Sequence, residues 1–92
     1  MPKLLNVEPV DELTVHLKYD DDLKGKVDLS KAIERNQFTE LKEKSEFSKV
    51  YVDEFTNELC WPSGARMCAN ALYKQLELLE LMRRLKIDID NE

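Results

Sequence analysis

Glycine, histidine and cysteine are scarce in this chain. Its 92 residues contain two glycines, one histidine (His16) and two cysteines. A phosphate-binding loop needs several glycines close together, and a zinc site needs about four ligands at recognisable spacing. Cys60 and Cys68 are eight residues apart without a C-x-x-C pattern, and His16 is far away. We therefore expect no metal ion and no cofactor.

Long apolar runs and excess positive charge are also absent. No segment approaches the roughly 20 apolar residues that span a bilayer, and Met1-Pro2-Lys3 leads into a strand-like run without the apolar region of a signal peptide. We expect a cytoplasmic protein with reduced thiols and no membrane contact. The net charge of -5 argues against a nucleic-acid partner, since such surfaces are usually basic. The one basic cluster, Arg83, Arg84 and Lys86, complements the dipole at a helix end.

No group of residues indicates catalysis. The sequence has no glycine-rich phosphate loop, no H-E-x-x-H and no serine or cysteine triad that the strand pattern would bring together. Asp53 and Glu54 are neighbours on a predicted strand, so their side chains point to opposite faces. Asp20-Asp21-Asp22 lacks the alternate spacing of a calcium loop and is typical of a solvated turn. We expect a protein that is not an enzyme.

The first thirty residues predict three strands. Residues 13–19 alternate strictly between apolar and polar, which is typical of a half-buried antiparallel strand and leaves His16 on the polar face. Residues 3–10 and 23–29 flank this segment as two further strands, with Gly25 as the site of a bulge.

The middle of the chain predicts short helical turns and then a hairpin. Ser30 is the expected N-cap of a short helix, and Phe38, Leu41 and Phe47 are expected to anchor the following segment on the sheet. Residues 50–55 and 58–61 form the hairpin, and Pro62 ends its second strand. Residues 69–86 contain no proline or glycine and predict one long helix.

Together these segments predict a single α+β domain over residues 1–92. It consists of an antiparallel sheet of about five strands, made of three strands, a short helical segment and a two-strand hairpin, with the C-terminal helix covering one face.

The segment Trp61-Pro62-Ser63-Gly64-Ala65, followed by Leu72-Tyr73, resembles the hallmark of the bacterial domain of unknown function 2442. The resemblance covers about residues 4–76 and implies a small α+β domain. The chain departs from the family pattern at four positions: Ser63 replaces an asparagine, Arg66 an aspartate, Ala69 a proline and Asn70 an acidic residue. Some relatives lie beside a gene for a second small protein, as in toxin–antitoxin pairs. The resemblance therefore implies an antitoxin-like or regulatory member of such a pair.

The same motif has a structural and a functional interpretation. Structurally, Trp61 closes the core, Pro62 and Gly64 set a chain reversal, and Leu72 and Tyr73 pack from the helix, with Tyr73 against the hairpin. The alternative is a small-molecule-binding site at the turn formed by residues 61–66.

The predicted C-terminal helix carries two apolar stripes. At about 100° per residue, Leu72, Leu76 and Leu79 share the stripe expected to lie on the sheet. A second stripe is turned well away from the first and contains Leu78, Leu81 and Leu85, with Met82 between the two. We expect a non-catalytic interaction module that uses this second stripe to bind itself or a protein partner. In the alternative, the segment around Phe38 to Phe47 wraps over the stripe and buries it.

Overall fold

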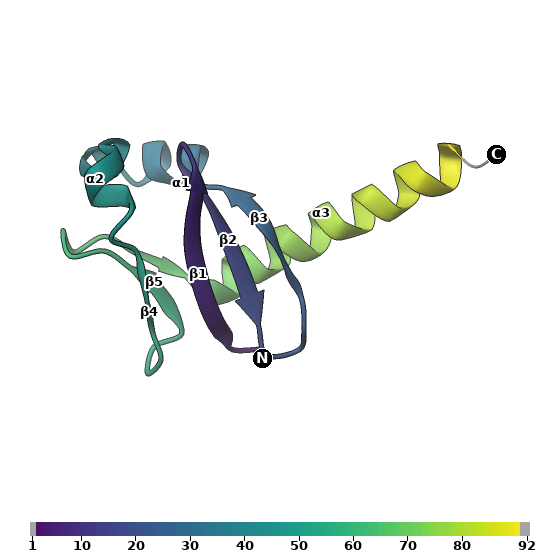
Figure 1. Cartoon of the computed structure of the whole chain (residues 1–92), viewed down its shortest axis with the longest axis horizontal. Coiled ribbons are helices and arrows are strands. Elements are labelled where there is room, and N and C mark those ends of the chain that lie inside the picture. The colour runs from purple at the N-terminus through teal and green to yellow at the C-terminus, as the bar shows by residue number, and fades with distance from the viewer. Residues whose placement is uncertain (1, 91–92) are drawn as a thin grey trace.

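Six strands form two separate antiparallel sheets in the computed structural model, which describes the backbone of residues 2–90 and the side chains of residues 2–85. The strand orders are β1-β2-β3 and β4-β5-β6 (Figure 1). The α+β class is confirmed, and the single sheet of about five strands is wrong. The elements in chain order are β1 (Leu4–Asp11), β2 (Thr14–Tyr19), β3 (Lys24–Asp28), α1 (Ser30–Arg35), the 3-10 helix η1 (Thr39–Lys42), α2 (Lys44–Phe47), β4 (Tyr51–Asp53), β5 (Glu58–Cys60), β6 (Arg66–Cys68) and α3 (Ala69–Asp90).

The predicted alternation of the second strand is confirmed. Val15, Leu17 and Tyr19 of β2 are fully buried, and the residues between them are half-buried or exposed. The three aspartates form the expected turn, in which the amide of Tyr19 donates a hydrogen bond to the carbonyl of Leu23 at 2.9 Å.

Gly25 makes room for a helix side chain and does not form the predicted bulge. It pairs with Leu17 in an unbroken β2–β3 register. A Cβ atom at position 25 would lie 2.8 Å from Cδ1 of Leu76 in α3. The missing side chain therefore lets α3 approach β3 closely.

The second sheet contains a strand that the sequence analysis missed. The chain reverses at Gly64, whose φ is +101°, and the amide of Trp61 donates to the carbonyl of Ala65 at 3.0 Å. The reversal is therefore a hairpin turn, and β6 returns along β5 with Cys60 opposite Arg66. Three residues are too few for a period-two pattern to be recognisable.

The short helical segment closes one end of the core. Leu41 and Phe47 are buried, and Phe38 is packed against them, as predicted. Ser30 is not an N-cap, because α1 already begins at this residue. The carboxylate of Asp28 accepts a hydrogen bond from the amide of Ser30 at 2.8 Å instead.

Helix α3 runs behind the β1–β3 sheet and extends well past it (Figure 1). It begins at Ala69 as predicted and continues to Asp90, four residues beyond the predicted end at Lys86. Ala69, Leu72 and Leu76 are buried. Within the described part of the helix no later residue is buried, so the second half of α3 is an overhang.

Candidate interaction surface on the C-terminal helix

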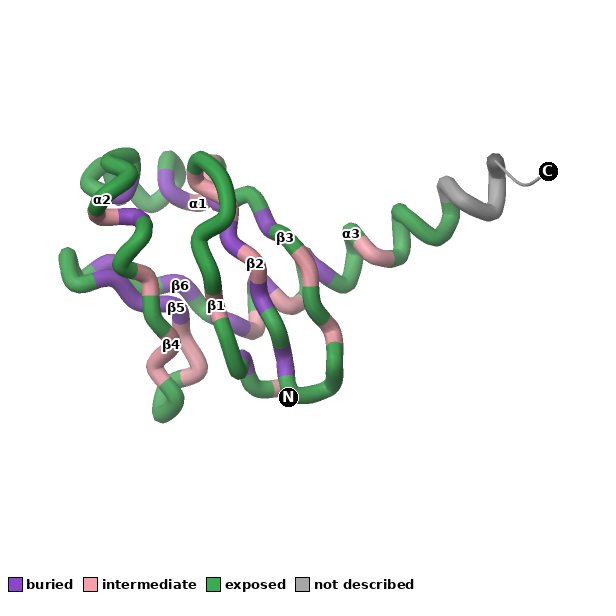
Figure 2. Tube along the Cα trace, in the orientation of Figure 1, coloured by how far each residue is buried: buried purple, intermediate pink, exposed green. Residues whose placement is uncertain are grey.

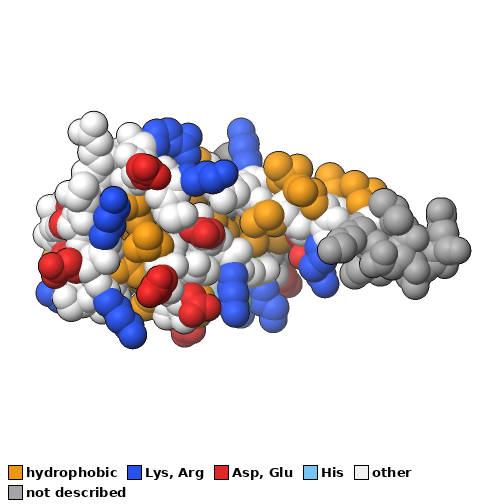
Figure 3. All heavy atoms as spheres, turned by 90° about the horizontal axis from the view of Figure 1, so that it is seen from above, with side chains coloured by type: hydrophobic (Ala, Val, Ile, Leu, Met, Phe, Trp, Pro, Cys, Tyr) orange, Lys and Arg blue, Asp and Glu red, His pale blue; other side chains and the backbone are white. Residues whose placement is uncertain are grey.

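The overhang of α3 exposes five large apolar side chains, which we call the apolar face of α3. Leu78, Leu81, Met82 and Leu85 are 54–56% exposed and Leu79 is 43% exposed. The burial pattern along the chain changes from mixed to exposed where the helix leaves the sheet (Figure 2). Apolar atoms follow the protruding helix on the surface seen in Figure 3.

Leu79 was predicted to be buried with Leu72 and Leu76, and this prediction is wrong. Leu76 contacts the sheet at Gly25, and Leu79 lies almost one turn further along the helix. The sheet does not extend beneath it. Leu79 therefore adds to the exposed surface and not to the core.

The alternative in which the segment around Phe38 to Phe47 covers the second stripe is also wrong. Leu41 and Phe47 are buried in the core, beside the turn between β1 and β2, where they border a hollow with Pro9 and Leu13. These helical turns lie at the end of the molecule opposite the C-terminus (Figure 1).

Charged residues occupy the other side of the overhang. The carboxylate of Glu80 pairs with Arg83 at 2.6 Å and with Arg84 at 3.6 Å. The hydrogen bond from Arg83 lowers the pKa of Glu80. Because these residues lie about 100° or more from the centre of the apolar face, the overhang is an amphipathic helix.

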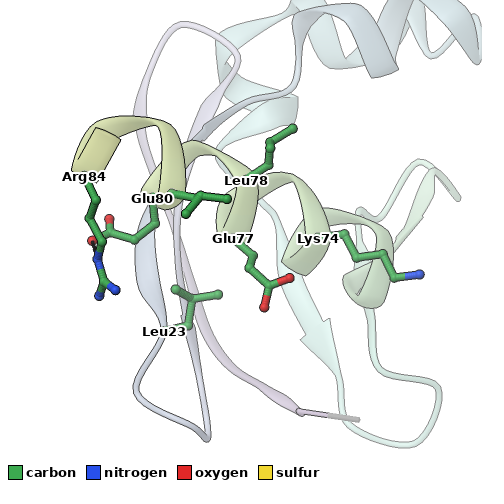
Figure 4. A pocket seen from close by; sticks show the side chains of 7 residues that line it. Leu23, Lys74, Glu77, Leu78, Glu80 and Arg84 are labelled. Carbon is green, nitrogen blue, oxygen red and sulfur yellow. Dashed lines mark ion pairs between the residues drawn. The ribbon is translucent and has the colours of Figure 1, made fainter. Parts of the chain in front are cut away.

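A shallow hollow lies on the charged side of the helix, between α3 and the turn before β3. Its volume is about 600 Å³, and Leu23, Glu77 and Arg84 border it. Figure 4 shows that Leu23 and Leu78 lie on opposite sides of α3. Leu78 and Leu81 of the apolar face also border this hollow, so the hollow adjoins one edge of the apolar face.

Trp61 is a core residue. Its side chain is 1% exposed, and its indole nitrogen donates a hydrogen bond to the carbonyl of Phe47 at 3.0 Å. Pro62 and Gly64 are exposed in the hairpin turn, and Leu72 is buried. The buried indole leaves no aromatic surface to stack on a ligand at this turn.

Arg66 stabilises the outer face of the small sheet. Its guanidinium pairs with Asp53 at 2.8 Å and with Glu58 at 3.0 Å. The contact with Arg66 lowers the pKa of Asp53, and hydrogen bonds from Thr56 and Arg66 lower the pKa of Glu58. A positive charge at position 66 therefore has two partners on neighbouring strands. Arg66 therefore takes part in a cross-strand ion network.

Tyr73 packs against the first sheet, and the prediction that it packs against the hairpin is wrong. Its ring meets Tyr19 edge-on at a centroid distance of 5.0 Å. Its hydroxyl donates to the carboxylate of Asp21 at 2.6 Å, and the hydroxyl of Tyr19 donates to the carbonyl of Ala69 at 2.6 Å. The two tyrosines fix the first turns of α3 on the sheet and so set the direction of the overhang.

We expect Tyr73→Phe to raise the pKa of Asp21 toward its ordinary value. The Tyr73 hydroxyl is the largest cause that lowers this pKa. The hydrogen bond favours the ionised carboxylate, so its contribution to stability is present above the ordinary pKa and is lost as pH falls through the lowered one. Carboxyl titration by NMR measures the change. Asp28 is the control. Hydrogen bonds from Ser30, and not from Tyr73, lower its pKa, so its titration should not change.

Asn57 lies in the predicted turn between the two hairpin strands, and it joins three elements. Its φ is +56°, and its side-chain oxygen accepts a hydrogen bond from the amide of Leu4 at 2.9 Å. Its side-chain nitrogen donates to Asn70 at 3.1 Å, and its carbonyl accepts from Ala69 at 3.1 Å. Asn57 therefore ties β1 and the start of α3 to the small sheet. The sequence indicated only an asparagine in a predicted turn, and no local pattern indicated its distant hydrogen-bond partners.

Neither a metal site nor a membrane span is found among the residues that the structure describes. No three histidine, cysteine or acidic side chains lie together there as metal ligands. No helix in the same residues is long and apolar enough to cross a bilayer. Both cysteines are free thiols, with Cys60 buried and Cys68 exposed.

Comparison with known proteins gives one match. No curated protein and no solved structure matches the chain. The sequence model of a family described as "Protein of unknown function (DUF2442)" matches residues 4–77, in agreement with the resemblance over residues 4–76. This match covers most of the chain, and the chain therefore belongs to the DUF2442 family.

Proposed function

We propose that this protein is a non-catalytic interaction module that binds a protein through the apolar face of α3. One observation carries the proposal: the helix leaves the sheet after Leu76, and five large apolar side chains follow on one side of it. Small monomeric domains rarely expose such a contiguous patch, and patches of this kind usually mark interaction sites. An amphipathic helix with anchors three and four residues apart is a recurring recognition element.

The energetic gain from covering this face is substantial. Burying the exposed half of one leucine or methionine contributes about 1 kcal/mol. Five such side chains therefore contribute about 5 kcal/mol before the entropic cost of association is subtracted. The charged residues on the other side of the overhang keep it solvated, so they orient the partner toward the apolar side.

The proposed role is that of the antitoxin-like or regulatory member of a small bacterial gene pair, acting in the cytoplasm. Its partner is a protein, either the product of the paired gene or a second copy of the chain. The net charge of -5 supports a protein partner over a nucleic acid. The proposed role requires neither a cofactor nor a metal ion.

The triple variant Leu78→Glu, Leu81→Glu, Leu85→Glu tests the proposal. We expect it to weaken binding to the product of the adjacent gene, or to itself, by more than about tenfold, because three anchors become charged at the contact. Calorimetry with purified proteins measures the affinity. We expect the melting temperature to change little, because the three side chains are exposed and glutamate is a good helix former.

The matched control is Leu5→Glu, Val10→Glu, Phe55→Glu. These three residues are also exposed and apolar, but they lie away from α3. The control adds the same charge and should leave binding unchanged. An equal loss of binding affinity in both triple variants would contradict a specific role for α3. Unfolding of the Leu78, Leu81, Leu85 variant alone would show that these leucines belong to a core.

A further inference from the structure

We infer that the apolar face of α3 binds a second copy of this chain, with the two helices antiparallel about a two-fold axis between Leu81 and Met82. This inference rests on the proposed function and specifies its partner. A two-fold interface must be complementary to itself, so the same residues have to fit when one helix is reversed. Both the apolar spacing and the charges beside it meet this requirement.

Four of the five positions of the apolar face read the same in both directions along the helix. Large apolar side chains occur at positions 78, 81, 82 and 85, which are symmetric about the midpoint between 81 and 82. In an antiparallel pair Leu78 lies opposite Leu85 of the other copy, and Leu81 lies opposite Met82. The spacing of three and four residues is that of helices that interlock along a common seam.

The charges beside the apolar face are complementary only in the antiparallel arrangement. Glu77 and Arg84 are seven residues apart and border the same edge of the face, next to Leu81. A two-fold axis perpendicular to the helices brings this edge against the same edge of the other copy. Measured along the helix axis, Glu77 then lies within about 3 Å of Arg84 of the other copy. Parallel helices would place Glu77 beside Gln75 and Leu79 of the other copy, which carry no charge.

The length of the overhang lets the two domains avoid each other. Leu76 is the last buried residue of the helix. At 1.5 Å per residue it lies about 8 Å from the proposed axis. The last buried residues of the two helices therefore lie about 16 Å apart along the helices, on opposite sides of the axis.

The area that such a pairing buries is small for a dimer. Five side chains of on the order of 100 Å² exposed area each give about 500 Å² per copy, or about 1,000 Å² in total. Stable specific interfaces usually bury about 1,200–2,000 Å². We therefore expect a weak dimer that forms and dissociates between micromolar and millimolar concentration, as suits an exchangeable partner.

Disulfide trapping distinguishes the antiparallel pair. Leu78→Cys and Leu85→Cys are made separately on a Cys68→Ser background, which removes the exposed native thiol. Each variant is incubated with a glutathione redox couple, alone and as an equal mixture with the other. Position 78 lies opposite position 85 of the other copy, so we expect a covalent dimer in the mixture and not in either variant alone. Covalent dimers that form equally in each single variant would overturn the antiparallel arrangement.

Charge reversal provides a second measurement in the full-length chain. We expect Glu77→Arg and Arg84→Glu each to weaken dimerisation about fivefold at low salt, measured by sedimentation equilibrium. The double variant should restore the wild-type value, because residues seven apart do not contact each other within one helix. Equal weakening in the double variant would show that the two charges do not meet.

Failure of this inference differs from failure of the proposed function. A wild-type chain that stays monomeric at millimolar concentration overturns the self-pairing. If its apolar face still binds the product of the adjacent gene, the proposed function stands with another partner. If binding to that product survives the triple glutamate change as well, the proposed function also fails.

Discussion

Replacing Trp61 with alanine is expected to lower the free energy of unfolding by about 3–5 kcal/mol. The side chain is 1% exposed and packs against Phe47, with a ring-centroid distance of 6.1 Å. Its removal leaves a large cavity between the small sheet and the helical segment, and the carbonyl of Phe47 loses its hydrogen-bond donor. Urea denaturation followed by circular dichroism measures the change.

Trp61→Phe is the matched control for this prediction. It retains an aromatic ring in the core and removes the indole donor, so it should cost about 1–3 kcal/mol, less than the alanine variant. A Trp61→Ala protein with an unchanged denaturation midpoint and a lost ligand would make Trp61 a recognition residue. That result would favour the small-molecule alternative at residues 61–66.

Replacing Leu76 with alanine is expected to cost about 2–5 kcal/mol and to change the effect of a substitution at Gly25. Leu76 is the last buried residue of α3 and fills the space above Gly25. Gly25→Ala alone should cost about 1 kcal/mol, because its Cβ would lie 2.8 Å from Cδ1 of Leu76 and this flexible side chain must move.

In the Leu76→Ala background the same Gly25→Ala change should be neutral or slightly stabilising. The obstructing methyl group is absent there, and alanine reduces the conformational freedom of the unfolded chain. The difference between the two backgrounds is the coupling energy of the pair. An identical cost of Gly25→Ala in both backgrounds would contradict the proposed role of the glycine as a contact site for α3.

Part of the candidate surface could be predicted from sequence. Helical periodicity alone indicated that Leu78, Leu81 and Leu85 share a stripe apart from Leu72 and Leu76, because 3.6 residues per turn is a local property. It also placed Leu79 with the buried stripe. That was wrong because periodicity gives the direction of a side chain and not the distance over which a sheet lies beneath it.

Other contacts depended on residues far apart in the chain. Asn57 and Leu4 are joined across 53 positions, and Tyr73 and Asp21 across 52. Such contacts have no local pattern, so neither was predicted. The same reason applies to β6, whose three residues acquire a strand conformation from pairing with β5.

The sequence by itself determined the alternation of β2, the aspartate turn, the start of α3 at Ala69 and the two stripes of that helix. Each follows from the periodicity or the turn chemistry of a few neighbouring residues. The tertiary structure alone decided that the strands divide into two sheets and that α3 extends beyond them. Burial of a stripe depends on what the rest of the chain places against it, and no described residue of α3 after Leu76 is buried.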